Sequence, residues 1–137
     1  MADKTLTVQN EQVRKKKILV IDDNQEILQL IEQWLTVDGF DVILADAAAE
    51  GFKRAIAETP DVIVTDILMP DMDGIQFIHQ LRGRSSDTWI VAMSGGGDLL
   101  PALTALHLSK SIGANRTVMK PMNKEELIDA IREGIDR

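Results

Sequence analysis

Short apolar segments alternate with longer amphipathic segments along most of this chain. The short segments are rich in β-branched residues and cover residues 18–21, 42–44, 62–64, 89–93 and 117–119. Nearly continuous apolar runs of this length are typical of strands that are covered on both faces. The pattern therefore predicts five buried strands.

The longer segments carry apolar residues at helical spacing. The first has an apolar face formed by Ile27, Leu28, Ile31, Trp34 and Leu35. Asp38-Gly39 predicts the end of this helix, because glycine commonly terminates helices. Further helices are predicted over residues 47–57, 75–81, 99–112 and 124–135. The predicted inward face of the second helix consists of Ala48, Phe52, Ala55 and Ile56.

Five strand–helix alternations predict an α/β fold with a parallel sheet and helices on both of its faces. The length of 137 residues corresponds to about one domain, and 45% apolar residues suffice for a buried core. Residues 1–15 are polar and lack periodicity. We therefore predict a flexible N-terminal tail over residues 1–15 and one domain over residues 16–137.

Composition excludes several classes of site. The absence of cysteine excludes a disulfide scaffold, thiol catalysis and a thiolate zinc site. His79 and His107 are too few for a histidine-rich metal site, and both are predicted as surface or packing residues. No apolar run approaches the roughly 20 residues that span a bilayer, and the N-terminus lacks the apolar stretch of a signal peptide. We expect a cytoplasmic protein with no membrane contact.

The charge of the chain is unevenly distributed. The net charge is −7, and residues 1–17 contain five basic and two acidic side chains, which leaves −10 for residues 18–137. An acidic body repels the phosphates of nucleic acids, so direct nucleic-acid binding is disfavoured.

Polar residues follow four of the predicted strands, at the point where each strand ends. Asp22 and Asp23 follow the first, Asp66 follows the third, Ser94 follows the fourth and Lys120 follows the fifth. Open parallel sheets bind ligands beyond the carboxyl ends of their strands. We therefore expect these side chains to meet at one edge of the sheet.

The expected set has a consistent chemistry. Three carboxylates in one cleft suit Mg²⁺, with Mn²⁺ as the alternative. A carboxylate nucleophile, a hard cation, a lysine and a hydroxyl together can transfer a phosphoryl group to an aspartate. Taken singly, each residue has a simpler interpretation: Asp22 or Asp23 as a helix N-cap, Asp66 in a turn, Ser94 in a loop and Lys120 in solvent.

Four segments in this order resemble the receiver domain of two-component response regulators, in particular stand-alone, chemotaxis-regulator-like members: ILVIDDNQEI, DVIVTDILMPDMDGIQFI, VAMSGGG and VMKPM. The resemblance spans residues 16–137. It implies a flavodoxin-like, doubly wound (βα)5 fold with five helices and a five-stranded parallel sheet in the order 2-1-3-4-5.

The resemblance also implies roles for individual residues. Asp66 resembles the phosphoacceptor, Asp23 the direct metal ligand and Asp22 its partner in the metal shell. The backbone carbonyl of Leu68 falls where the family completes that shell. Ser94 and Lys120 match the hydroxyl and the amine that contact the phosphoryl group. Pro121 follows Lys120 as a candidate for a cis peptide bond, and Met69-Pro70 and Asp73-Gly74 fit the turn into the third helix.

The chain departs from the family pattern at three places. Thr117 stands three residues before the lysine, where the family usually has an aromatic ring that takes part in switching. The fourth predicted helix, over residues 99–112, is about one turn longer than usual and apolar on more than one face, which suits either a partner surface or packing over its own loop. Gly95, Gly96 and Leu68 flank the site and affect access of water to it.

The leading hypothesis is a single-domain response regulator, not an enzyme, that accepts a phosphoryl group on Asp66 from a histidine kinase or a histidine phosphotransfer protein. Its output is then altered binding to another protein or to itself through the fourth helix, fifth strand and fifth helix. The alternatives are a receiver-like interaction module that works without phosphorylation, and a receiver segment of a larger regulator. A dehalogenase-type hydrolase is disfavoured because Leu68 stands where that family has a second acid, and an FMN-binding flavodoxin because no phosphate-binding loop follows the first strand.

Overall fold

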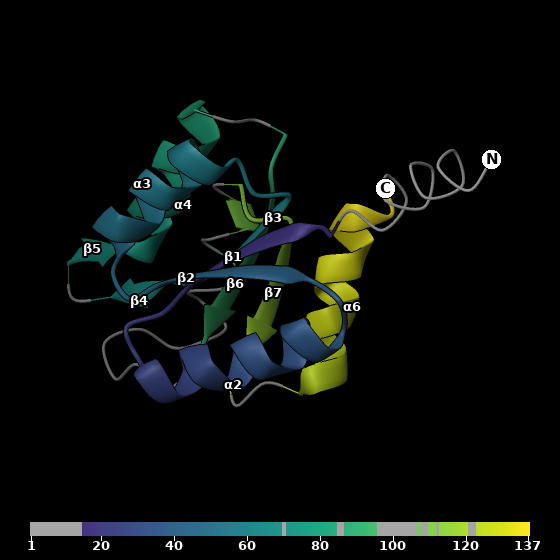
Figure 1. Cartoon of the computed structure of the whole chain (residues 1–137). Helices are drawn as coiled ribbons and strands as arrows, with labels where there is room; N and C mark the ends of the chain where they lie inside the picture. The colour runs from purple at the N-terminus through teal and green to yellow at the C-terminus, as the bar shows by residue number, and fades with distance from the viewer. Residues whose placement is uncertain are drawn as a thin grey trace.

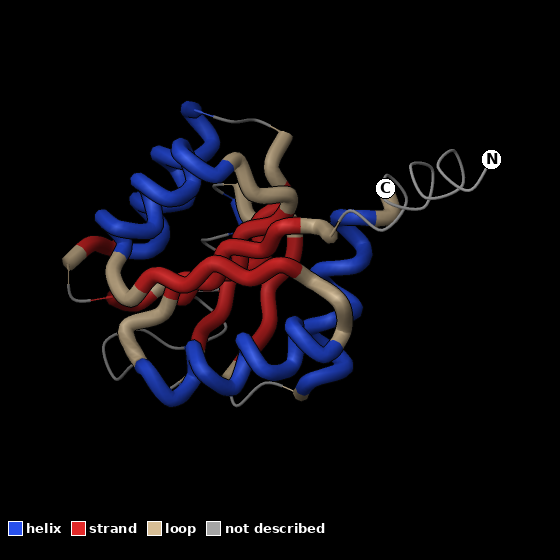
Figure 2. The backbone as a smooth tube through the Cα atoms, in the orientation of Figure 1, coloured by secondary structure: helices blue, strands red, loops and turns tan. Residues whose placement is uncertain are grey.

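A five-stranded parallel sheet forms the centre of the computed structural model (Figure 2). The structure describes residues 15–69, 71–84, 87–95, 107, 110–111, 113–120 and 123–137. The strands are β1 (Lys17–Ile21), β2 (Asp41–Ala45), β3 (Val62–Asp66), β6 (Trp89–Ser94) and β7 (Arg116–Met119). They lie in the order β2-β1-β3-β6-β7, and each neighbouring pair is parallel. The predicted fold and the predicted order 2-1-3-4-5 are confirmed.

Helices cover both faces of the sheet (Figure 1). Helices α2 (Gln25–Val37) and α6 (Lys124–Ile135) lie on one face, and α3 (Ala48–Glu58) and α4 (Gly74–Arg84) lie on the other. The predicted helix over residues 99–112 falls outside the described residues, apart from His107, Lys110 and Ser111, which are helical. No helix in the described part of the chain is both long and apolar enough to cross a bilayer.

Each face of the sheet has its own hydrophobic core, because successive side chains of a strand point to opposite faces. Leu19, Ile21 and Ile63 belong to the core under α3 and α4. Ile18 and Val20 belong to the core under α2 and α6. Burial on both faces explains why the strands are apolar at nearly every position.

The ends of α2 follow from local chemistry. The side chain of Asn24 accepts hydrogen bonds from the amides of Glu26 and Ile27 and so caps the start of the helix. Gly39 has φ of 93° just beyond the C-cap Asp38. This left-handed conformation favours glycine, and it confirms the predicted end at Asp38-Gly39.

The structure differs from the sequence-based expectation at α3. Ile56 was predicted to face inward, but it is 45% exposed. The buried residues of α3 are the small Ala48 and Gly51, with Phe52 and Ala55 partly buried beside them. A helix that packs through small residues buries a narrow face, and Ile56 falls at the edge of that face.

A second, two-stranded antiparallel sheet follows β3 and has no counterpart among the predicted elements. It consists of β4 (Leu68–Met69) and β5 (Met72–Asp73) and leads into α4. Strands of two residues are too short to show periodicity, so the same residues indicated only a turn.

Candidate functional site

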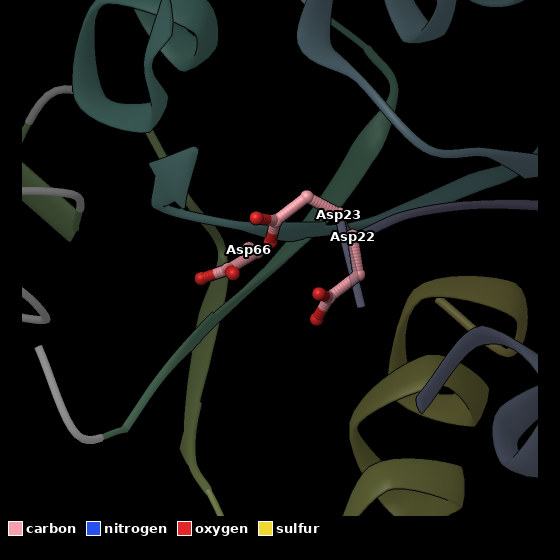
Figure 3. A group of neighbouring side chains, drawn as sticks. All are labelled: Asp22, Asp23 and Asp66. Carbon is pink, nitrogen blue, oxygen red and sulfur yellow. The ribbon is translucent and has the colours of Figure 1, made fainter. Parts of the chain in front are cut away.

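Three aspartates meet at the carboxyl ends of β1 and β3 (Figure 3). One carboxylate oxygen from each of Asp22, Asp23 and Asp66 lies within 4.8 Å of the others. Asp66 is the last residue of β3 rather than the residue after a shorter strand, and Asp22 and Asp23 directly follow β1. The parallel sheet therefore brings together residues that are more than 40 positions apart, as predicted.

The first turn of α2 does not use either aspartate as its N-cap. Asn24 takes that role, which corrects the simpler interpretation of Asp22 and Asp23. Asp22 accepts a hydrogen bond from the Asn24 amide through Oδ1 over 2.9 Å, and its side chain is fully buried. Asp23 is exposed, so the cluster is open to solvent on one side.

Lys120 connects the two buried aspartates. Its Nζ donates to Asp22 Oδ2 over 2.5 Å and to Asp66 Oδ2 over 3.3 Å, and its side chain is 14% exposed. Burial lowers the pKa of Lys120, but the hydrogen bonds and negative charges of the two carboxylates outweigh burial and leave the pKa raised. Lys120 is therefore a fixed positive charge at physiological pH.

Gly95 allows Lys120 to approach the site. The Lys120 amide donates to the carbonyl of Ser94 over 2.8 Å, which places Gly95 directly against the lysine backbone. A Cβ on Gly95 would lie 2.3 Å from Cβ of Lys120 and 2.7 Å from its carbonyl oxygen. From the sequence, Gly95 is expected only to affect the access of water to the site. Its contact with Lys120 is not predictable there, because a close approach between two strand ends leaves no local sequence signal.

Ser94 places a hydroxyl inside the site. Ser94 ends β6 and is 1% exposed, and its Oγ makes no hydrogen bond to any residue that the structure describes. A buried polar atom without a partner costs free energy. Such an atom at the edge of an acidic cluster suits a ligand oxygen that arrives during function.

The cluster has the donor set of a divalent cation site. Carboxylate oxygens are hard ligands, and the exposed side at Asp23 leaves room for the waters that Mg²⁺ usually keeps. Three carboxylates against the one ammonium of Lys120 give this group of side chains an excess of two negative charges. The residues therefore fit Mg²⁺, and Mn²⁺ by the same argument.

The remaining predicted site residues are placed as follows. Leu68 begins β4, two residues beyond Asp66, and the role of its carbonyl stays a prediction. Thr117 lies half-buried in β7 and pairs with Ala92. His79 and His107 are exposed. Pro121, Gly96 and residues 1–14 lie outside the described residues. Most of the predicted helix over residues 99–112, with its predicted partner surface, also lies outside them.

Comparison with known proteins agrees with the fold. The family model for the response regulator receiver domain matches residues 18–132. The chain is 34% identical over 126 residues to a probable transcriptional regulator, ycf27, of Cyanophora paradoxa, which covers 92% of this chain and 51% of that protein. It is 35% identical over 112 residues to the alkaline phosphatase synthesis transcriptional regulatory protein PhoP of Bacillus subtilis, covering 82% and 45%. The chain thus spans about half the length of these curated relatives.

A solved structure matches the chain along most of its length. The response regulator receiver domain protein from Clostridium thermocellum superposes with a TM-score of 0.82 at 31% sequence identity. The match covers 89% of this chain and 95% of that chain. The fold and the sequence therefore indicate the same family.

Proposed function

We propose a function that proceeds from the family of this chain, which belongs to the response regulator receiver domain family. In this proposal, Asp66 accepts a phosphoryl group, and phosphorylation changes the binding of the domain to a partner. The family places the chain as the receiver domain of a two-component response regulator. The acceptor residue, the donor and the output are the parts that we propose.

One observation carries the proposal. The Asp66 carboxylate lies 3.3 Å from the ammonium of Lys120 and within 4.8 Å of two further carboxylates, at the carboxyl edge of the sheet. Asp66 is 6% exposed, so a phosphodonor can reach it only from the open side of the cluster. The neighbouring ammonium is a donor for oxygens of an incoming phosphoryl group, and so is the hydroxyl of Ser94, which has no partner among the described residues.

The proposed step transfers the phosphoryl group from a phosphohistidine of a histidine kinase or a histidine phosphotransfer protein. A carboxylate oxygen of Asp66 forms a bond to phosphorus while the phosphorus–nitrogen bond of the donor breaks and its electron pair stays on the imidazole. Lys120 donates to a phosphoryl oxygen and so compensates the charge of the acyl phosphate, about −1.5 to −2, which replaces the single negative charge of the carboxylate. Ser94 supplies its hydroxyl to another oxygen.

Asp22, Asp23 and Asp66 would hold Mg²⁺, or Mn²⁺, together with the Leu68 carbonyl. When bound, the ion supplies positive charge that offsets the charge on the transferring phosphoryl group. Asp22 is held for this task by the Asn24 amide, and Lys120 is held by the backbone bond to Ser94.

We propose that the domain acts as a switch rather than as an enzyme with a separate substrate. Its output is then altered binding to another protein or to a second copy of itself, through the face formed by the predicted helix over residues 99–112, β7 and α6. The acidic body of the chain argues that this domain makes no direct contact with nucleic acid. Histidine kinases draw on ATP, so we place the protein in the cytoplasm.

The proposal is tested by intact-mass spectrometry after incubation with Mg²⁺ and acetyl phosphate. We expect the wild type to gain the mass of one phosphoryl group, Asp66→Asn to gain none, and Asp41→Asn to behave as the wild type. Asp41 is a matched control because it is exposed at the amino end of β2, at the opposite edge of the sheet. Equal labelling of Asp66→Asn and wild type would contradict the assignment of the acceptor.

Thr117 supports a second candidate function, an interaction module that works without phosphorylation. It occupies the β7 position where the family usually has an aromatic ring, and a threonine cannot replace the movement of that ring. This candidate predicts no phosphoryl gain in the wild type even when Mg²⁺ binding has been confirmed by titration.

A further inference from the structure

The segment that follows Asp66 is fixed at its base by backbone contacts. The Ile67 amide donates to the Met93 carbonyl over 3.1 Å, and the Gly74 amide donates back to the Ile67 carbonyl over 2.9 Å. A Cβ on Gly74 would lie 2.1 Å from Cα of Ile67, so only glycine allows this closure. We call the described residues between these two contacts, Ile67–Met69 and Asp71–Gly74, the acceptor loop. It includes Leu68, whose carbonyl is a proposed metal ligand.

The acceptor loop is anchored a second time at its tip. Asp71 lies in the turn between β4 and β5, and its carboxylate accepts hydrogen bonds from the amides of Ala48 and Ala49 over 3.1 and 3.0 Å. Figure 1 shows β4 and β5 beside the amino end of α3, which follows β2 in the chain. The hydrogen bond from the Ala49 amide lowers the pKa of Asp71 most strongly; burial opposes this effect, and the hydrogen bond from the Ala48 amide adds to the lowering.

Helix α3 has no cap of its own. Its N-cap residue is Ala47, which makes no side-chain capping hydrogen bond. In α2 and α6, by contrast, the residue just before the helix caps it, Asn24 and Asn123 respectively. The first amides of a helix need acceptors, and a carboxylate there also interacts favourably with the helix dipole. Asp71 meets this need from 23 positions away, so the bond ties α3 to the acceptor loop.

We propose that Asp71 is a positioning residue for the phosphorylation site, because it fixes the acceptor loop and its Leu68 carbonyl against the amino end of α3. The proposal rests on the proposed function, in which that carbonyl binds the metal ion. Without Asp71 the loop keeps the backbone contacts at its base and the buried Met69, but it loses its described bonds to α3, and the Leu68 carbonyl samples positions that do not bind metal. The apparent affinity for metal falls in proportion to the fraction of molecules in the competent position.

The proposal is tested by Mg²⁺ titration of the protein followed by amide NMR spectra. We expect the dissociation constant for Mg²⁺ to rise at least about fivefold in Asp71→Ala, a typical lower value for coupled sites. Asp71→Asn keeps one acceptor oxygen and should lie between Asp71→Ala and wild type. Asp38→Ala is the matched control. Like Asp71→Ala, the Asp38→Ala substitution removes one negative charge. It also removes the ion pair between Asp38 and Arg132 at the far end of α2. Its constant should stay within about twofold of wild type.

A second signal distinguishes positioning from simple helix capping. Coupling is reciprocal, so Mg²⁺ should shift the amide resonances of Ala48 and Ala49 in the wild type with the same midpoint as those near Asp66. In Asp71→Ala these two resonances should no longer respond. Equal Mg²⁺ affinity in Asp71→Ala and Asp38→Ala would overturn the proposal. A wild type that binds no Mg²⁺ would overturn the metal part of the proposed function and, with it, the proposal that depends on that part.

Discussion

Replacement of Lys120 by methionine should destabilise the protein and, unlike most substitutions at a ligand site, should not weaken the binding of Mg²⁺. The Lys120 ammonium lies 2.5 Å from Asp22 and 3.3 Å from Asp66, and the Asp22 side chain is fully buried. At an effective dielectric constant of about 20, the attraction over 3.3 Å amounts to about 5 kcal/mol, and that over 2.5 Å is somewhat larger.

Only part of this attraction appears as stability. The ammonium loses hydration when it is buried, and this cost offsets much of the Coulomb energy. Removing one partner of a buried pair typically costs about 3–5 kcal/mol because a buried charge remains uncompensated. The Lys120 side chain retains 14% exposure, so we take the lower value of about 3 kcal/mol. For a chain of 137 residues this corresponds to a fall in Tm of about 10 °C.

Urea unfolding followed by circular dichroism measures this loss in the absence of divalent cations. Lys53→Met is the matched control, because Lys53 is exposed on α3 and its loss should change the free energy of unfolding by less than about 0.5 kcal/mol. Mg²⁺ should bind Lys120→Met at least as tightly as wild type, since an ammonium no longer repels it, while phosphorylation by acetyl phosphate slows. If Lys120→Met unfolds at the same urea concentration as Lys53→Met, the two ion pairs of Lys120 do not stabilise the fold.

Three further predictions concern contacts outside the ion pairs. Gly95→Ala should displace Lys120, because the new Cβ would lie 2.3 Å from Cβ of Lys120. Labelling of the protein by acetyl phosphate should then slow at least about tenfold. Unchanged labelling kinetics would contradict the close approach of Gly95 to Lys120. Asp71→Ala should cost about 0.5–1 kcal/mol at pH 7. The lowered pKa of Asp71 means that this stability is present above the unfolded-state pKa of about 4. It is lost as the pH falls through the folded-state value, so urea midpoints of the two proteins should converge in acid, and a constant difference would refute the cap. Arg82→Lys should lower the free energy of unfolding in urea by about 2 kcal/mol. The reason is that Arg82 donates hydrogen bonds to the carbonyls of Thr88 and Gly113 and to Asn115 Oδ1. An unchanged urea midpoint would mean that these hydrogen bonds do not stabilise the protein.

The elements of the fold were predictable because each carries a local signal. A strand buried on both faces must be apolar at nearly every position, and β1, β6 and the first three residues of β3 show this directly. The end of α2 at Asp38-Gly39 was predictable for a similar reason, since a left-handed residue favours glycine. The short β4 and β5 carry no such signal, and the structure alone defines them.

The candidate site was predictable in its composition but not in its geometry. The rule that parallel strands present ligand groups at their carboxyl ends was enough to group Asp22, Asp23 and Asp66. The same rule could not show that Lys120 contacts Asp22 more closely than Asp66, or that the Ser94 hydroxyl is buried without a partner among the described residues. Those facts depend on how the ends of separate strands are placed relative to one another, to within less than about one ångström.

The alternation of strands and helices, the parallel sheet and the kinds of side chain at its carboxyl edge follow from the amino-acid sequence, because local periodicity records which residues must be buried. The cap that Asp71 provides for α3, the contact of Gly95 with Lys120 and the exposure of Ile56 are visible only in the folded chain. Each of these depends on how elements distant in the chain pack against one another, and packing between distant elements leaves no periodic trace in either segment.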